Sequence, residues 1–159
     1  MDEMRAGVLT VSDRVSRGEA EDASGPTAIA ILAGLGFEVD WRVVPDERDQ
    51  IQHVLREWIE GGVHLVITTG GTGFAPRDVT PEATADLIER PAPGLVEAAR
   101  SAATHPYAML SRGVAGIAGS TLIVNLPGST PGVEESLGVI RPVLVHAVSL
   151  INRSDTPHQ

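Results

Sequence analysis

Three glycines in four positions follow the third apolar run of the chain. Residues 68–73 read Thr-Thr-Gly-Gly-Thr-Gly, and a loop with so few side chains lets backbone N–H groups turn inward and approach an anion closely. Phosphate is the ligand that this arrangement favours. The segment has neither the Gly-Lys-Ser/Thr of a Walker A loop nor the spacing of a dinucleotide-binding fingerprint. A tight turn without a ligand is therefore the alternative interpretation.

Two aspartates accompany this loop. Asp78 lies five residues beyond Gly73, and a helix is expected to open at Thr80 and Pro81. Thr80 can cap that helix, which leaves Asp78 available for a ligand. Asp46 follows the second predicted strand, and it shares a rim with the loop if the two strands are parallel. Because Mg²⁺ usually binds through one or two carboxylates plus substrate phosphates, the pair indicates a magnesium site; a helix cap and a solvated turn are the structural alternatives.

Two other strand exits carry small polar residues. The first strand is followed by residues 12–14, Ser-Asp-Arg, and later by residues 22–26, Asp-Ala-Ser-Gly-Pro, for which a loop with a helix cap is the favoured interpretation. The last strand continues into residues 125–130, Asn-Leu-Pro-Gly-Ser-Thr. An amide there can read a heterocycle and a hydroxyl can hold phosphate, but a simple turn explains these residues equally well.

The elements that must position these loops follow from hydrophobic periodicity. Short apolar runs predict strands at residues 6–11, 37–44, 63–69 and 121–126. Helical spacing and Pro or Gly signals predict helices at residues 26–36, 51–59, 80 onward, 93–103 and 131–151. This alternation predicts a three-layer α/β/α fold with a mostly parallel, Rossmann-like central sheet, whose ligands bind beyond the carboxyl ends of the strands. Residues 109–119 fit an irregular strand or a small edge hairpin, and Pro142 is expected to split or kink the last helix.

Composition narrows the class of protein. The 159 residues contain 12 Lys+Arg and 21 Asp+Glu, a net charge of −9, and 42% are hydrophobic. This fits one globular domain, predicted over residues 1–153, with a polar tail at 154–159. An acidic chain with 3% aromatics lacks the basic face that nucleic-acid binding requires. Without cysteine, a membrane-length apolar run or a secretory signal, we expect a cytoplasmic protein with no membrane partner.

Residues 68–84, TTGGTGFAPRDVTPEAT, closely resemble the signature of the molybdenum-cofactor biosynthesis domain family. Shorter segments fall in that family's order and at its spacing, namely residues 12–14, 22–26, 44–47, 110–112 and 125–128. The resemblance covers about residues 7–151 and is to the stand-alone bacterial form.

The resemblance implies adenylylation of molybdopterin by ATP with Mg²⁺, which releases pyrophosphate. It implies catalytic and magnesium-binding roles for two carboxylates, Asp46 and Asp78. It implies phosphate or nucleotide binding by the loops that contain Ser12, Asp13, Thr69, Gly70, Gly71, Thr72 and Gly73. It implies molybdopterin binding by Ser111, Arg112, Asn125, Pro127, Gly128 and Ser129. The net negative charge is no obstacle, because we expect a local cationic spot formed by Arg14, Arg77 and Arg112.

The resemblance also implies a homo-oligomer, a trimer or a hexamer. Residues 143–151 contain more apolar side chains than one helix face needs, which fits an interface there. Two alternatives stay open. One is a molybdopterin-binding or carrier protein of the same fold, and the other is the family domain related to a nucleotide pyrophosphatase. The presence of both aspartates favours the transferase over the carrier, and the length of a single domain disfavours the pyrophosphatase.

Overall fold

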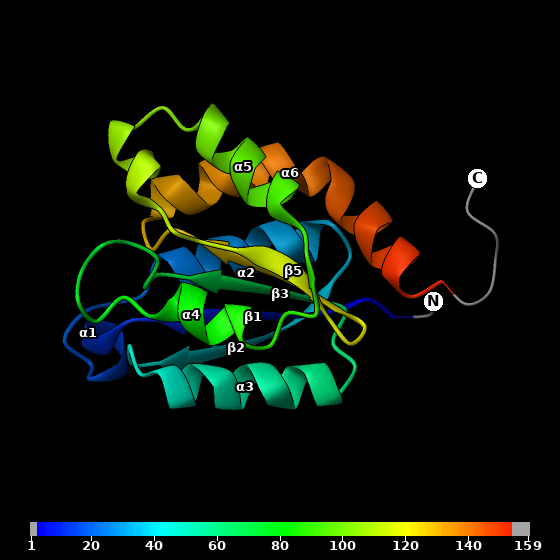
Figure 1. The fold of residues 1–159 in the computed structure, drawn as a ribbon, viewed down its shortest axis with the longest axis horizontal. Coiled ribbons are helices and arrows are strands. Elements are labelled where there is room, and N and C mark those ends of the chain that lie inside the picture. The colour runs from blue at the N-terminus through cyan, green and yellow to red at the C-terminus, as the bar shows by residue number, and fades with distance from the viewer. Residues whose placement is uncertain (1–2, 154–159) are drawn as a thin grey trace.

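A computed structural model describes residues 3–153 and builds them around a six-stranded sheet (Figure 1). The strand order is β2-β1-β3-β6-β5-β4. The bounds are β1 (Arg5–Val11), β2 (Glu38–Val44), β3 (Leu65–Thr69), β4 (Arg90–Pro91), β5 (Ala115–Ala118) and β6 (Thr121–Leu126). The strands β2, β1, β3 and β6 are parallel, whereas β5 and β4 are antiparallel. The predicted mostly parallel α/β sheet is confirmed. The predicted polar tail, residues 154–159, lies outside the described residues.

Helices cover both faces of this sheet. Their bounds are α1 (Asp13–Ser16), α2 (Ser24–Gly34), α3 (Arg48–Glu60), α4 (Thr80–Ala85), α5 (Pro93–Ala102) and α6 (Thr130–Ile151), with a 3₁₀ helix, η1, at Pro106–Leu110. Figure 1 shows α2, α5 and α6 on one side of the strands and α3 on the other. No helix of the described residues is long and apolar enough to cross a membrane.

The core follows the alternation of side chains along the central strands. In β1, Ala6 and Val8 pack in a cluster with α2, α5 and α6, whereas Leu9 and Val11 pack in a second cluster with α3. Because helices cover both faces of the sheet, the side chains on both faces of β1 are apolar, and its sequence is one continuous hydrophobic run. The sheet therefore gives the loops at its carboxyl edge a rigid base.

The segment 109–119 contributes one strand, β5, next to the edge strand β4. The chain turns at Gly119 with a φ of +59°, and β5 pairs antiparallel with β6. The expected hairpin therefore forms between this segment and the predicted strand at residues 121–126, rather than within the segment. The two-residue strand β4 pairs with β5 and was not expected from the sequence. Its Pro91 is acceptable because an edge strand does not need every N–H for pairing.

A split or a kink was expected at Pro142; the last helix, α6, runs for 22 residues through this proline, so the split does not occur. Four buried side chains on both sides of the proline, Leu137, Ile140, Leu144 and Val148, hold the two halves against the sheet. Packing thus outweighs the one backbone hydrogen bond that proline removes. Of the apolar residues expected at an interface, Val143 is 46% exposed, while Leu144 and Val148 belong to the core.

Gly138→Ala is expected to stabilise the protein. A Cβ at Gly138 has nothing within 4 Å, and the residue lies inside α6, where alanine is favoured over glycine by roughly 0.5–1 kcal/mol. Urea unfolding should show a gain in unfolding free energy of about that size. A loss of stability would mean that the exposed face of α6 is covered in solution.

Candidate active site

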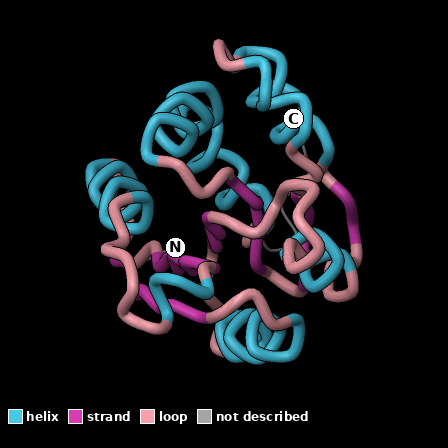
Figure 2. Tube along the Cα trace, turned by 90° about the vertical axis from the view of Figure 1, so that its left-hand side faces the viewer, coloured by secondary structure: helices cyan, strands magenta, loops and turns pink. Residues whose placement is uncertain are grey.

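Four parallel strands end at the same rim of the sheet. In the register, Val11 of β1 pairs with Val44 of β2, and Thr69 of β3 pairs with both Thr10 and Leu126. The loops that follow these strands gather on the side of the molecule that faces the viewer in Figure 2. The rim therefore brings together all four polar strand exits that the sequence singled out.

The glycine loop makes a tight turn directly after β3. Gly70 and Gly71 have φ angles of +93° and +69°, and a Cβ would meet the Val11 carbonyl oxygen at the first and the Thr80 hydroxyl at the second. Thr80 anchors the turn, because its hydroxyl donates to the Gly70 carbonyl at 3.0 Å and its N–H donates to the Gly71 carbonyl at 3.1 Å. The expectation that Thr80 caps α4 is wrong. Val79 takes the cap position, since the Thr80 hydroxyl is drawn to the turn.

Asp46 and Asp78 flank this turn. The Asp46 Oδ1 atom lies 3.0 Å from the position of a Cβ at Gly71, and the Asp78 Oδ2 atom lies 3.0 Å from that of a Cβ at Gly73. The Ala75 N–H donates to Asp78 Oδ2 at 3.1 Å and orients that carboxylate. Within residues 3–153, no three His, Cys, Asp or Glu side chains form a metal cluster. A cation here would need oxygens from a substrate in addition to the two carboxylates.

Asp13 links the exits of β1 and β2. Its N–H donates to Asp46 Oδ2 and its Oδ1 accepts from the Asp46 N–H, both at 3.0 Å. Arg77 binds the Asp13 carboxylate through Nε at 2.7 Å and Nη2 at 3.0 Å, and Nη2 also donates to Glu47 at 3.0 Å. Asp13, predicted to bind phosphate, therefore joins the glycine-loop segment to the neighbouring strands.

The two linked aspartates have opposite pKa shifts. Hydrogen bonding from Arg77 lowers the pKa of Asp13 to about 2. Burial raises the pKa of Asp46, and the nearby carboxylates of Asp13 and Asp78 add to the effect. The protein thus does not fully balance the negative charge of an ionised Asp46, and this favours a cation beside the carboxylate.

Asp13→Asn is expected to make the free energy of unfolding less dependent on pH in the acidic range. Because the folded pKa of about 2 lies below the ordinary value of 3.8, ionised Asp13 stabilises the fold above that value and the contribution disappears as the pH falls through about 2. Unfolding free energy, measured between the two pKa values and at neutral pH, should fall less steeply with acid in the variant. Parallel curves would show that the ion pair with Arg77 does not affect stability.

Two of the three arginines expected to form a local cationic spot are neutralised by carboxylates. Arg77 is paired with Asp13 and Glu47, and Arg112 is paired with Glu82 at 2.6 Å. The carboxylates that neutralise them come from other loops and helices, so their approach was not visible in the local sequence. Arg14 is exposed on α1.

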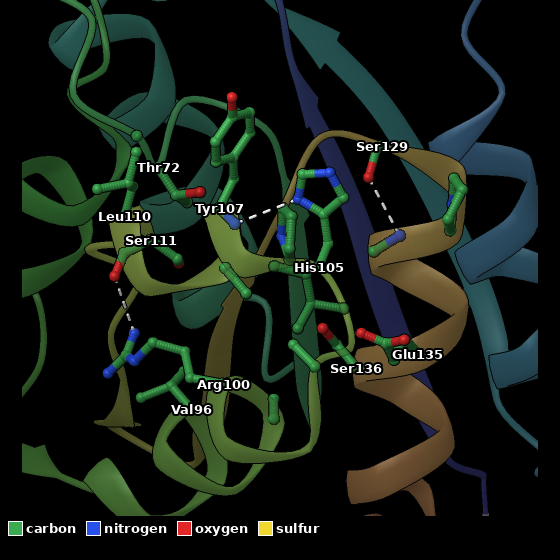
Figure 3. A pocket seen from close by; sticks show the side chains of 18 of the residues that line it. Thr72, Val96, Arg100, His105, Tyr107, Leu110, Ser111, Ser129, Glu135 and Ser136 are labelled. Carbon is green, nitrogen blue, oxygen red and sulfur yellow. Dashed lines mark hydrogen bonds between the residues drawn. The ribbon is translucent and has the colours of Figure 1, made fainter.

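A cavity of about 600 Å³ opens between α5, η1 and the start of α6 (Figure 3). Six predicted site residues line it, namely Thr72, Gly73, Ser111, Asn125, Pro127 and Ser129. Apolar side chains supply much of the wall, including Val96, Tyr107 and Leu110. The cavity joins the end of the glycine loop to the predicted molybdopterin residues, and its size suits a small-molecule ligand. No local motif had indicated the wall that α5 and η1 provide.

Three of these lining residues already use their side chains within the protein, and Ser111 does so by accepting from the Gly113 N–H at 3.3 Å. The Asn125 amide donates to Thr68 at 2.9 Å and to Thr84 at 3.0 Å, and its oxygen accepts from the Val114 N–H at 3.1 Å. Ser129 accepts from the Gly132 N–H at 3.1 Å and caps α6, which leaves the hydroxyl hydrogen available. Asn125 therefore ties β6 to β3 and α4.

A smaller cavity, about 250 Å³, lies on the other side of the same turn. Four predicted site residues line it, namely Ser12, Thr69, Gly70 and Gly128. The carboxylates of Asp46 and Asp78 are absent from the described lining of both cavities. The two spaces thus adjoin opposite ends of residues 69–73.

A hydroxyl network in the wall of the smaller cavity was not predicted from the sequence. Asp22 accepts from the Thr10 hydroxyl at 2.5 Å and from the Ser24 hydroxyl at 3.1 Å. The Trp41 indole N–H donates to the Thr10 oxygen at 3.1 Å. Asp22 also accepts from the Gly25 N–H at 3.0 Å, although the cap position of α2 belongs to Ala23. The partners Thr10 and Trp41 come from β1 and β2, so only the fold reveals them.

Comparisons with known proteins agree with this geometry. A family model described as a probable molybdopterin binding domain matches residues 7–146. The molybdopterin adenylyltransferase of Escherichia coli K12 is 39% identical over 158 residues, which covers 93% of this chain and 81% of that protein. The crystal structure of the molybdopterin biosynthesis enzyme MoaB from Thermus thermophilus is 51% identical with a TM-score of 0.88, covering 93% of this chain and 96% of that one.

The same domain occurs inside longer relatives. Gephyrin of Dictyostelium discoideum is 44% identical over 164 residues, which covers 95% of this chain and 23% of that protein. The chain thus spans about a quarter of gephyrin, and 26% of the molybdenum cofactor synthesis protein cinnamon of Drosophila melanogaster. The family match covers most of the residues that build the rim, the glycine turn and both cavities, and the chain belongs to the family of probable molybdopterin binding domains.

Proposed function

We propose that this protein is a molybdopterin adenylyltransferase of molybdenum cofactor biosynthesis. The observation that carries the proposal is the pair Asp46 and Asp78 beside a glycine turn, with a cavity at each end of that turn. Two substrates of different shape need two adjoining spaces. Support comes from bacterial relatives named molybdopterin adenylyltransferase, two of which align with 95% and 93% of this chain.

In the proposed reaction, an oxygen of the molybdopterin phosphate attacks the α-phosphorus of ATP. The new O–P bond forms as the bond to the β-phosphate oxygen breaks, so the products are adenylylated molybdopterin and pyrophosphate. Little covalent work falls to the protein, because such transfers depend on positioning and charge stabilisation. We assign phosphate binding to backbone N–H groups of residues 71–73, because the Gly70 N–H donates to the Leu126 carbonyl at 3.1 Å. The positive φ angles of Gly70 and Gly71 permit that turn.

The residues present fit a magnesium ion. Asp46 is a partly buried carboxylate whose pKa is raised by its surroundings, and Asp78 is close enough to contribute to that shift. These two carboxylates would hold Mg²⁺ together with substrate phosphates, which is the usual manner of binding for this ion. When bound, the ion would neutralise phosphate charge. The protein's own part is to keep both carboxylates beside the turn through the Asp13 link and the Ala75 N–H.

We propose further that the larger cavity holds molybdopterin, with Ser111, Pro127 and Ser129 as direct contacts. Ser12, Thr69 and Gly70 line the smaller cavity and are assigned to the nucleotide. Thr72 and Gly73 line the larger cavity at the end of the glycine loop and are assigned to phosphate where the two substrates meet. Gly128 packs closely against the turn, since a Cβ on it would lie 3.1 Å from the Gly70 Cα. The internal bonds of Asn125 make its contribution indirect.

Incubation with molybdopterin, ATP and Mg²⁺, followed by pyrophosphate detection, tests the function. We expect pyrophosphate only when all three are present. Molybdopterin binding without pyrophosphate would favour the carrier. Cleavage of ATP without molybdopterin would favour the nucleotide pyrophosphatase relationship.

We also propose a homotrimer, with a hexamer as the larger possibility. Large apolar side chains remain exposed around the mouth of the larger cavity and on α6, namely Phe74, Tyr107, Met109, Leu110 and Val143. Covering them would lower the free energy of the assembly. Sedimentation at micromolar concentration is expected to show three copies, and a clean monomer would contradict this.

A further inference from the structure

Arg112 makes four hydrogen bonds to the glycine-loop region. Its backbone N–H donates to the Thr72 carbonyl at 2.7 Å. Its guanidinium donates through Nε to the Gly73 carbonyl at 2.7 Å, through Nη2 to the Asp78 carbonyl at 2.8 Å, and through Nη1 to the Glu82 carboxylate at 2.6 Å. One side chain therefore bridges Gly73 at the end of the glycine loop, Asp78 five residues beyond it, and the helix α4 that follows.

The backbone on both sides of Arg112 is bonded to α5. The Arg100 Nη1 atom of α5 donates to the Gly113 carbonyl at 3.0 Å and to the Ser111 carbonyl at 3.3 Å, and Figure 3 shows Arg100 beside Ser111 at the cavity wall. The residues on both sides of Arg112 are thus fixed to α5. The guanidinium is directed toward the loop by a braced backbone.

We infer that Arg112 is a positioning residue that holds the Asp78 carboxylate in place, rather than a ligand of molybdopterin. Its three donor nitrogens bond three different protein acceptors that lie around the loop. The acceptors match the fork of a guanidinium, which a lysine ammonium cannot reproduce. The inference rests on the proposed function only for its kinetic readout.

The test compares Arg112→Ala and Arg112→Lys with Arg48→Ala. Arg48 is a matched control because it also pairs with a carboxylate at α4, Asp86, but bonds none of residues 72–78. Loss of a residue that orients a metal-binding group typically costs 10- to 100-fold. We expect kcat of Arg112→Ala to fall by about that factor, with KM for both substrates within about 3-fold. Arg48→Ala should match the wild type.

Amide hydrogen exchange gives a readout that needs no substrate. The Asp78 N–H donates to the Ala75 carbonyl and the Thr80 N–H to the Gly71 carbonyl, so both amides report the loop. Exchange at these amides should accelerate in Arg112→Ala, remain fast in Arg112→Lys, and slow again when guanidinium ion is added to Arg112→Ala. Activity should return with the added ion.

Unchanged exchange together with a raised KM for molybdopterin alone would overturn the inference and make Arg112 a substrate ligand. Wild-type activity in Arg112→Lys would also overturn it, since a single charge would then suffice. If Arg112→Ala does not fold, Arg112→Lys decides by the same two readouts. An inactive wild type would refute the proposed function, and the exchange measurements would still decide whether Arg112 orders the loop.

Discussion

Asp78→Asn is expected to slow adenylyl transfer at saturating ATP and Mg²⁺ by at least about 10²-fold, because loss of one electrostatic contact to a transition state typically costs 10²- to 10³-fold. The substitution keeps the volume of the side chain and its Oδ acceptor for the Ala75 N–H. The fold should therefore be preserved. Molybdopterin binding should stay within a few-fold of wild type, since the larger cavity does not include Asp78 among its lining residues.

Asp46→Asn should have the same kinetic effect, with equal or higher stability at neutral pH. The folded state raises the pKa of Asp46, mainly through burial, so ionising this carboxylate costs stability once the pH exceeds the raised pKa. Asparagine removes that cost. Single-turnover transfer and urea unfolding on the same samples test both parts. If both variants turn over at the wild-type rate, the carboxylates are structural and the carrier function gains support.

Gly73→Val is expected to leave the fold intact and reduce transfer by about 10²-fold, the usual scale when a reacting group moves by about 1 Å. A Cβ at this position would lie 3.0 Å from Asp78 Oδ2, and the additional methyl groups would displace that carboxylate. Gly73 does not have a positive φ, so valine brings no backbone strain. The measurements are transfer rate, ATP affinity and circular dichroism.

Two other glycines serve as controls for Gly73→Val. Gly71→Val combines a φ of +69° with a collision against Thr80, so it should lose stability as well as activity. Gly94→Ala places its Cβ in open space and should behave as wild type. A folded Gly73→Val with normal transfer and normal ATP affinity would remove the glycine loop from the site.

The sheet was predictable because its signals are local. Buried parallel strands read as continuous apolar runs, and β6 at Thr121–Leu126 has the predicted bounds. The hairpin of β5 was harder, since Ala115–Ala118 is short and contains glycine. The strand β4 was not predicted because two residues carry no periodicity, and its pairing depends on a distant segment, with Arg90 opposite Ile117 and Pro91 opposite Gly116.

The site was predictable where loops follow strands and unpredictable where side chains meet across loops. Asp46 and the glycine loop could be placed on one rim because the alternation of strands and helices predicts parallel strands. That Arg77 would bind Asp13, 64 positions earlier, could not. The family resemblance implies a molybdopterin-binding role for Arg112, whereas in the fold its Nε and Nη2 atoms donate to the carbonyls of residues 73 and 78. Local sequence shows which charges exist and not which ones neutralise each other.

The bond between Trp41 and Thr10 gives the protein an internal optical probe. The indole of Trp41 is 42% exposed, and its N–H reaches a hydroxyl that lines the smaller cavity. The other tryptophan, Trp58, is 4% exposed, and its N–H donates to Asp40 instead. Emission from an indole depends on its polarity and hydrogen bonding, so Trp41 alone should shift when a molecule fills the cavity. Occupancy can thus be followed by fluorescence in the unlabelled protein, against the constant background of Trp58.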